Sequence, residues 1–207
     1  MIVFKFIIIA VISYLLGSLN FGVILSRGMK NEDVRDSGSG NAGTTNMMRT
    51  YGKTLGLFTI AGDILKVVLA IWLAFRIVSV EELKMTLDSA SDYPQVVLKS
   101  FAGLFAVLGH IFPCYFKFKG GKGVATSGGM VIAIDWRIAL ILLAIFALTI
   151  LITKYVSLGS ILMAIFYPVF IGIFYKDIIL VLIALVFTVI VVVAHRENVK
   201  RLINHTE

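Results

Sequence analysis

Residues 1–16 read MIVFKFIIIAVISYLL, an apolar run interrupted only by Lys5 and Ser13. The run extends to about residue 25, and about 20 apolar residues are enough for a helix to cross the hydrocarbon core of a bilayer. Further apolar runs of this kind recur to the C-terminus, and no convincing small-residue cleavage site follows the first. The first run is therefore predicted to be a retained membrane helix rather than a cleaved signal peptide.

The composition of the whole chain indicates the same class. Of its 207 residues, 59% are apolar and 15% are charged, and the mean hydropathy is +0.97. A soluble domain of this length could not bury so much apolar surface. Cys114 is the only cysteine, which excludes an internal disulfide and a cysteine metal cluster. We expect an all-α integral membrane protein in which residues 1–207 form a single domain.

Seven apolar runs are predicted to be transmembrane helices. The fourth is only thirteen residues long, so we expect a short or re-entrant helix there, which is tolerated only beside protein or a water-filled cavity. The runs lie at residues 2–25, 55–78, 96–115, 123–135, 138–154, 157–175 and 178–194.

Positive charge predicts how these helices are oriented. If the N-terminus faces outside, twelve of the nineteen lysines and arginines lie in cytoplasmic segments and five in outside segments. Charges near the ends of spans are counted with the flanking segments, so only Lys66 and Lys99 lie within spans, and the outside stretch 80–95 is acidic. The positive-inside rule therefore favours an outside N-terminus and a cytoplasmic C-terminus. It also explains the net charge of +7 without nucleic acid.

The first of three polar segments on the predicted cytoplasmic side is GSGNAGTTNMMR, residues 38–49. Its glycines allow the backbone to turn and to present N–H groups to an anion. Arg49 adds a planar guanidinium that can donate hydrogen bonds to two phosphate oxygens. The segment predicts a phosphate-binding cradle. A flexible loop would explain the glycines but not the dense polar side chains. The candidate residues are Ser39, Gly40, Asn41, Gly43, Thr44, Thr45, Asn46 and Arg49.

The second segment is KGGKGVATSGG, residues 119–129, where the apolar pattern resumes at once. It is predicted to open a helix whose N-terminus attracts a second anion. A nucleotide-binding P-loop is excluded because Gly123, and not Ser or Thr, follows Lys122. The alternative is a positively charged membrane anchor with a flexible hinge. The candidate substrate-binding residues are Lys119, Gly120, Gly121, Lys122, Gly123 and Ser127.

The third segment is HRENVKR, residues 195–201, at the exit of the last span. If the helix continues, His195 and Asn198 share one face, although a terminal histidine can also be a capping residue. Asp63 and Lys66 are predicted to form a bracing ion pair inside a span, and a structural role is favoured for His110. No carboxylate or histidine cluster with metal-ligand spacing lies near the three segments, so we expect no metal and no cofactor.

The combination of these motifs resembles the bacterial membrane-integral acyl-phosphate:glycerol-3-phosphate acyltransferases, the PlsY family. GSGNAGTTNMMR, KGGKGVATSGG and AHRENVKRL carry the resemblance in this order, with GHIFPCYF between the first two. Thr44 departs from the alanine that is common in the family. The resemblance implies a seven-helix protein of the bacterial inner membrane with a cytoplasmic active site. It also implies acyl transfer from acyl phosphate to the 1-hydroxyl of glycerol 3-phosphate, the first step of phospholipid biosynthesis, which yields lysophosphatidic acid and inorganic phosphate.

The resemblance also assigns roles to residues. Ser39, Arg49, His195 and Asn198 would be catalytic, the glycines of the second motif would bind glycerol 3-phosphate, and Glu197 would support the local structure. Whether His195 or a substrate phosphate oxygen accepts the proton of the attacking hydroxyl stays open. The expected partners are the two phosphorylated substrates, membrane lipids and the enzyme that supplies acyl phosphate, and no nucleic acid.

Three other classes fit the sequence less well. A transporter of phosphorylated solutes would place its polar groups near the membrane midplane, whereas these segments share one boundary. Acyltransferases with a His-x-x-x-x-Asp motif are excluded because Tyr115 and Lys200 lie five residues after His110 and His195. A CDP-alcohol transferase needs several aspartates on its helices, whereas Asp63 is the only acidic residue in the interior of a predicted span, and Asp135 lies at the very end of the fourth.

Overall fold

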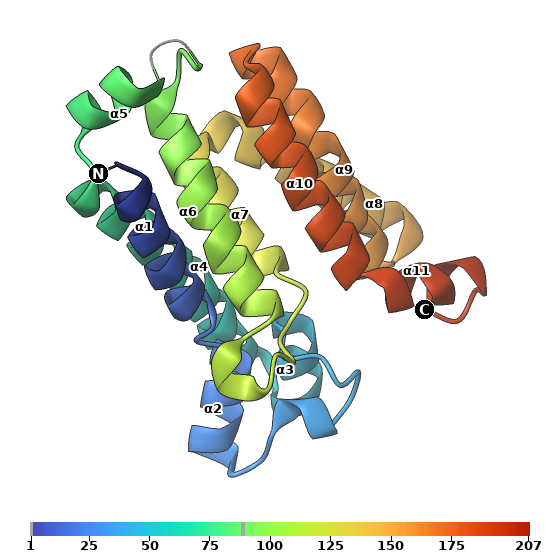
Figure 1. The fold of residues 1–207 in the computed structure, drawn as a ribbon. Helices are drawn as coiled ribbons and strands as arrows, with labels where there is room; N and C mark the ends of the chain where they lie inside the picture. Colours follow the sequence, from blue (N-terminus) through green and yellow to red (C-terminus); the bar gives the residue numbers. More distant parts are fainter. Residues whose placement is uncertain (1, 88–89) are drawn as a thin grey trace. The chain divides into compact units, whose positions relative to one another are not determined.

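Every regular element in the computed structural model is a helix, within the described residues 2–87 and 90–207 (Figure 1). Each of the seven predicted apolar runs is mainly helical, with a break in the first and an end at Ile111 in the third. Positions 88 and 89, inside the acidic stretch placed outside, are not among the described residues. The elements are α1 (Ile2–Gly17), α2 (Phe21–Lys30), η1 (Val34–Asp36), α3 (Thr44–Tyr51), α4 (Lys53–Ile77), α5 (Val80–Leu87), α6 (Pro94–Ile111), η2 (Cys114–Phe116), α7 (Val124–Ile134), α8 (Trp136–Thr153), α9 (Val156–Tyr175), α10 (Ile178–Ala194) and α11 (Arg196–Ile203).

Length and composition identify five candidate membrane spans in the described part of the chain. A sixth results if the bent pair α10 and α11 counts as one span, and α7, with eleven residues, is shorter. The all-helical membrane class is thus confirmed, whereas the number seven and the orientation stay predictions. The five spans are Ile2–Lys30, Lys53–Ile77, Pro94–Phe116, Trp136–Thr153 and Val156–Tyr175.

The first span contains a break that hydropathy did not predict. Helix α1 ends at Gly17 and α2 begins at Phe21, with Asn20 as the N-cap whose side chain accepts the Val23 N–H at 3.4 Å. The Leu19 carbonyl, freed from helical bonding, accepts a hydrogen bond from Lys66 Nζ at 3.0 Å. A polar side chain inside the membrane region thus finds its partner at a helix break.

The chain divides into two compact units, which we describe separately. The first contains residues 1–79 and 101–130, and the second contains residues 80–100 and 131–207. In the first unit, α1, α2 and α3 pack against α4. The single domain expected from the sequence stays a prediction.

A buried polar network crosses the first unit. Lys66 Nζ lies 2.8 Å from Asp63 Oδ1, which confirms the predicted ion pair, and 2.8 Å from His110 Nδ1. All three residues are buried, and unpaired charges at such depth would cost several kcal/mol, so the contacts offset a large penalty. Because Lys66 also bonds to Leu19, the network links α4, α6 and the break between α1 and α2. His110 therefore has the structural contacts that were favoured for it.

In the second unit, α9 packs against both α8 and α10, and aspartates cap two of these helices. Asp177 accepts the Ile179 N–H at 2.9 Å and contacts the Ser91 hydroxyl. Asp135 caps α8 and accepts hydrogen bonds from the Arg137 guanidinium at 2.7 Å and the Tyr175 hydroxyl at 3.1 Å. The hydrogen bond from Arg137 lowers the pKa of Asp135 to about 2.

Replacing the Asp135 cap tests this description. Asp135→Ala removes the N-cap and the ion pair and is expected to cost about 0.5–2 kcal/mol, which lowers the Tm in detergent by roughly 1–8 °C. A carboxylate with a lowered pKa stabilises above its ordinary pKa of 3.8, and this contribution is lost as the pH falls through about 2. The Tm difference from wild type should thus be constant between about pH 5 and pH 8 and shrink below about pH 4.

Asp92→Ala is the matched control, because Asp92 is an exposed aspartate of the same unit. Its Tm should stay near that of wild type. An Asp135→Ala protein with an unchanged Tm, or with a difference that disappears between pH 7 and pH 5, would contradict the role of this cap.

Candidate active site

The first glycine-rich segment forms a loop that leads into α3. Gly38 and Gly40 adopt positive φ angles of 60° and 70°, in agreement with the predicted turn. Asn46, buried in α3, accepts the Ser39 N–H at 2.8 Å through Oδ1 and donates to the carbonyls of Val34 at 2.9 Å and Ser37 at 3.0 Å. Its amide therefore holds the loop in shape, and substrate binding by Asn46 stays a prediction.

Other polar groups of this loop are available to a ligand. Ser39, Thr45 and Arg49 are exposed, and within the described part of the chain Arg49 has no hydrogen-bond or ion-pair partner. The Thr44 hydroxyl is buried without a hydrogen-bond partner in the same residues, at the first position of α3. Asn41 accepts the Gly43 N–H at 2.8 Å, which fixes the residue before the helix. The first turn of a helix offers N–H groups to an anion, so the loop can bind phosphate.

The second glycine-rich segment folds back onto the end of α6. Gly120 N–H donates to the Ile111 carbonyl and Gly121 N–H to the His110 carbonyl, both at 3.2 Å. A methyl group on Gly121 would overlap Nε2 of the His110 imidazole, so only glycine fits there. Gly123 has a φ of 80°, and α7 begins directly after it, as the sequence predicted.

Basic and hydroxyl groups surround the start of α7. Lys119 is exposed, and Lys122 is half-buried with contacts of its own. The Ser127 hydroxyl is buried and has no hydrogen-bond partner among the described residues. The positive end of the α7 dipole and two lysines favour a bound anion. This segment therefore has the groups of a second phosphate site.

Arg35 joins the two loops, and sequence reasoning counted it only as a cytoplasmic charge. Its Nη1 donates to the carbonyls of Phe116 at 3.0 Å and Lys119 at 2.8 Å, while Nε and Nη2 bond to Asp33 at 2.9 and 2.7 Å. The hydrogen bond from Arg35 holds the pKa of Asp33 well below its usual range. The structure thus brings the first and second motifs together within the first unit. Asp33 and Arg35 lie two residues apart just ahead of the glycine loop, and this spacing was the feature of the sequence that could have indicated a role for Arg35.

The third motif belongs to the second unit and differs from its predicted geometry. The helix does not continue straight through His195, which was the condition for the shared face, because α10 ends at Ala194 and α11 begins at Arg196 with a bend of 61°. His195 and Asn198 are nevertheless both buried. The Asn198 amide donates to Glu207 at 2.8 Å. Glu197 is exposed and pairs with Lys200 at 3.3 Å, which is the kind of local contact expected for it.

The His195 ring has a defined tautomer. Nδ1 lies 2.8 Å from the Val191 carbonyl oxygen, which can only accept a hydrogen bond. Nδ1 therefore carries the proton, and in the neutral ring Nε2 is the proton-accepting nitrogen. This tautomer is compatible with a general base.

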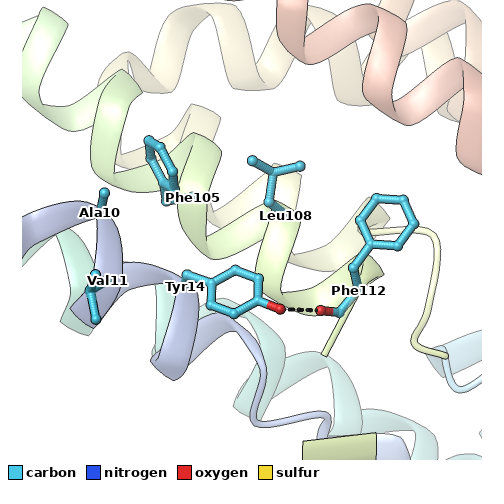
Figure 2. A pocket seen from close by; sticks show the side chains of 6 residues that line it. All are labelled: Ala10, Val11, Tyr14, Phe105, Leu108 and Phe112. Carbon is cyan, nitrogen blue, oxygen red and sulfur yellow. Dashed lines mark hydrogen bonds between the residues drawn. The ribbon is translucent and has the colours of Figure 1, made fainter. Parts of the chain in front are cut away.

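An apolar depression of about 360 Å³ lies between α1 and α6, and Figure 2 shows the side chains that line it. Its one hydroxyl, that of Tyr14, donates to the Phe112 carbonyl at 2.6 Å. Such a surface has no group that binds phosphate, so it is not the candidate active site. Ala10, Val11, Tyr14, Phe105, Leu108 and Phe112 line it.

Comparison with known proteins identifies the class. The profile of the glycerol-3-phosphate acyltransferase family matches residues 7–205. The glycerol-3-phosphate acyltransferase of Clostridioides difficile (strain 630) is 41% identical over 99% of this chain and 95% of its own length. That of Bacillus subtilis (strain 168) is 40% identical over 97% of this chain and 95% of its own length.

Solved structures agree with these sequence matches. The crystal structure of PlsY (YgiH), an integral membrane glycerol 3-phosphate acyltransferase, in its glycerol 3-phosphate form has a TM-score of 0.83 and 33% identity. The match covers 98% of this chain and 94% of that one. The lysophosphatidic acid form of the same protein gives a TM-score of 0.81 at 31% identity, over 98% of this chain and 93% of that one.

These matches define an integral membrane acyltransferase of phospholipid biosynthesis. The chain belongs to the glycerol-3-phosphate acyltransferase family and resembles PlsY over nearly its whole length.

Three glycine substitutions test the second loop. If this loop binds glycerol 3-phosphate, Gly121→Ala should raise the KM for that substrate because the methyl group displaces the backbone from His110. Gly123→Ala should act in the same direction because alanine is strained at a φ of 80°. Both should change the KM of the acyl donor less. Steady-state kinetics with each substrate varied in turn give the two constants.

The matched control is Gly128→Ala, which adds a methyl group in the same segment where, apart from the local helix backbone, nothing lies within 4 Å. It should keep both constants near wild type. Equal increases for the two substrates in Gly121→Ala and Gly123→Ala, or no increase, would count against this loop as the glycerol 3-phosphate site.

Proposed function

We propose that this protein transfers a fatty acyl group from acyl phosphate to the 1-hydroxyl of glycerol 3-phosphate, which yields lysophosphatidic acid and inorganic phosphate. The observation that carries the proposal is the pair of glycine-rich loops that Arg35 joins in the first unit. The reaction has two phosphorylated substrates, and the chain offers two loops suited to phosphate. The glycerol 3-phosphate and lysophosphatidic acid forms of PlsY lend further support.

We assign one phosphate to each loop. Ser39, Arg49 and the backbone from Gly38 to Thr45 would hold the acyl phosphate, while Lys119–Gly123 and Ser127 would hold glycerol 3-phosphate. Arg49 suits the first role because it is exposed and offers two parallel donors. His195 and Asn198 would complete the catalytic group.

The chemistry needs positioning more than activation. The oxygen of the 1-hydroxyl attacks the acyl carbonyl carbon, a new ester C–O bond forms, and the bond between that carbon and the phosphate oxygen breaks. The departing phosphate takes the electron pair of the broken bond. Because acyl phosphate is already an activated anhydride, alignment and stabilisation of the developing charge supply most of the rate.

The hydroxyl proton has two possible acceptors. A phosphate oxygen of the substrate can take it, and so can His195 Nε2, because the Val191 carbonyl holds the proton of the ring on Nδ1. We favour positioning by the protein over obligatory base catalysis. We expect no metal and no cofactor in either case.

The cellular setting belongs to the same proposal. We infer a single functional domain over residues 1–207, seven membrane helices with α7 as the short fourth, an outside N-terminus and a cytoplasmic C-terminus. The active site would face the cytoplasm from the bacterial inner membrane. The partners would be membrane lipids and the enzyme that supplies acyl phosphate, without nucleic acid.

Phosphate release tests the reaction. Purified protein in detergent or vesicles should release inorganic phosphate only when both acyl phosphate and glycerol 3-phosphate are present, and an equal amount of lysophosphatidic acid should form. Turnover should survive EDTA and need neither ATP nor coenzyme A. Uptake of glycerol 3-phosphate into vesicles without phosphate release would favour a transporter. Loss of turnover in EDTA that magnesium restores would contradict the metal-free account.

Arg49→Lys separates a phosphate ligand from a membrane anchor. An anchor needs only positive charge, whereas a phosphate ligand uses the two parallel N–H donors that lysine lacks. Loss of one charge-assisted hydrogen bond should lower kcat/KM by roughly 10- to 150-fold. Arg49→Ala and Ser39→Ala should also be severely impaired. Steady-state kinetics on well-folded protein give the values.

Lys53→Ala is the control for Arg49, since Lys53 is a nearby exposed charge outside the motif. It should stay near wild type. Full activity of correctly inserted Arg49→Lys would leave Arg49 as a membrane anchor and would remove it from the proposed site.

A further inference from the structure

The Arg35 guanidinium contacts two separate segments of the chain. On one side Nε and Nη2 bind the two oxygens of Asp33 in a parallel pair, at 2.9 and 2.7 Å. On the other side Nη1 reaches the carbonyls of Phe116 and Lys119, which are more than 80 residues further along the chain. The side chain is only 18% exposed, so these bonds are partly shielded from water.

The Asp33 end of this contact is rigidly attached. Asp33 also accepts the backbone N–H of Arg35 at 3.0 Å, which closes the turn before η1. Val34 between them is fully buried and packs in a cluster with Val23, Ala42, Met47 and Leu55. Asn46 binds the Val34 carbonyl from α3. Arg35 therefore projects from a packed segment that lies directly before the first motif.

The other end of the contact lies on the second motif. The Lys119 carbonyl belongs to the same peptide group as the Gly120 N–H, which bonds to the Ile111 carbonyl at 3.2 Å. The next N–H, that of Gly121, bonds to His110. Arg35 thus holds one side of a glycine-rich peptide whose other side rests on α6. Without that bond, two glycines would leave the peptide wide conformational freedom.

We propose that Arg35 is a positioning residue that fixes the Lys119–Gly123 loop next to the glycine loop of the first motif. It acts through the two backbone carbonyls and touches no substrate. Asp33 orients the guanidinium by binding its other edge. Lysine cannot replace Arg35, because one ammonium group cannot hold a carboxylate in parallel geometry and reach two carbonyls at once. The part of this inference that concerns substrate rests on the proposed function.

Arg35→Lys tests the proposal, with Arg27→Lys as the matched control. Arg27 also binds Asp33, at 2.9 Å, and its guanidinium lies 5.7 Å from the centre of the Phe116 ring, compared with 5.8 Å for Arg35. Unlike Arg35, Arg27 has no hydrogen bond to the second loop in the described part of the chain. The control thus changes the same kind of side chain at the same carboxylate.

Kinetics give the first readout. Arg35→Lys should raise the KM for glycerol 3-phosphate by about tenfold or more, the effect of about one lost charge-assisted hydrogen bond. The KM for acyl phosphate should change by less than about threefold, which is well below the roughly tenfold change expected from the loss of one charge-assisted hydrogen bond. Arg27→Lys should keep both constants near wild type. Equal changes in both constants of Arg35→Lys would overturn the proposal, because a general structural defect does not distinguish the substrates.

Hydrogen exchange gives a readout that needs no substrate. The Gly120 and Gly121 amides should exchange about tenfold faster in Arg35→Lys than in wild type or Arg27→Lys, as expected if their protection depends on one such bond. Faster exchange in Arg35→Lys, combined with a wild-type protein that releases no phosphate, would support the positioning role while the proposed function fails. Unchanged exchange would overturn the positioning role itself. If Arg35→Lys does not fold, Asp33→Asn should show a smaller increase in the exchange of the same two amides. Unchanged exchange in Asp33→Asn would also overturn the positioning role of Arg35.

Discussion

The charge-assisted hydrogen bonds between the Arg35 guanidinium and the backbone carbonyls of Phe116 and Lys119 hold the second glycine-rich loop of the first unit beside the first. Glycine-rich loops have little side chain to bury, so apolar packing cannot keep them in one conformation. Directional bonds from a partly buried cation can do so. The same loops then leave their own polar groups, such as the exposed Arg49, available to a substrate.

A second constraint comes from the buried polar network of the first unit. Lys66 in α4 contacts Asp63, His110 and the Leu19 carbonyl, so its charge is satisfied inside the first unit. His110 connects this network with the second loop, because its carbonyl accepts the Gly121 N–H and its ring leaves no space for a Cβ at that position. The loop that we assign to glycerol 3-phosphate is therefore supported by Arg35 from one side and by α6 from the other.

The sequence predicted what hydropathy and local chemistry determine. The apolar runs gave the helices, the spacing of Asp63 and Lys66 gave their ion pair, and the glycines gave the turn at Gly38 and the start of α7. Contacts between distant segments could not be predicted, because nothing local relates Arg35 to Lys119. The break before Phe21 and the bend at His195 were not predicted either. Hydropathy shows that a run of residues is apolar, but it does not show where a helix within or after that run is interrupted. The orientation of Asn46 toward the loop backbone depends on the same tertiary folding.

The central claim is that the two joined loops hold two different phosphates at once. The most direct test is a structure determined with glycerol 3-phosphate and a non-hydrolysable acyl phosphonate bound together. The account predicts one phosphate at Lys119–Gly123 and the phosphonate at the loop that ends with Arg49, with the Arg35 bonds intact between them. Both groups on one loop, or either group away from both loops, would contradict it.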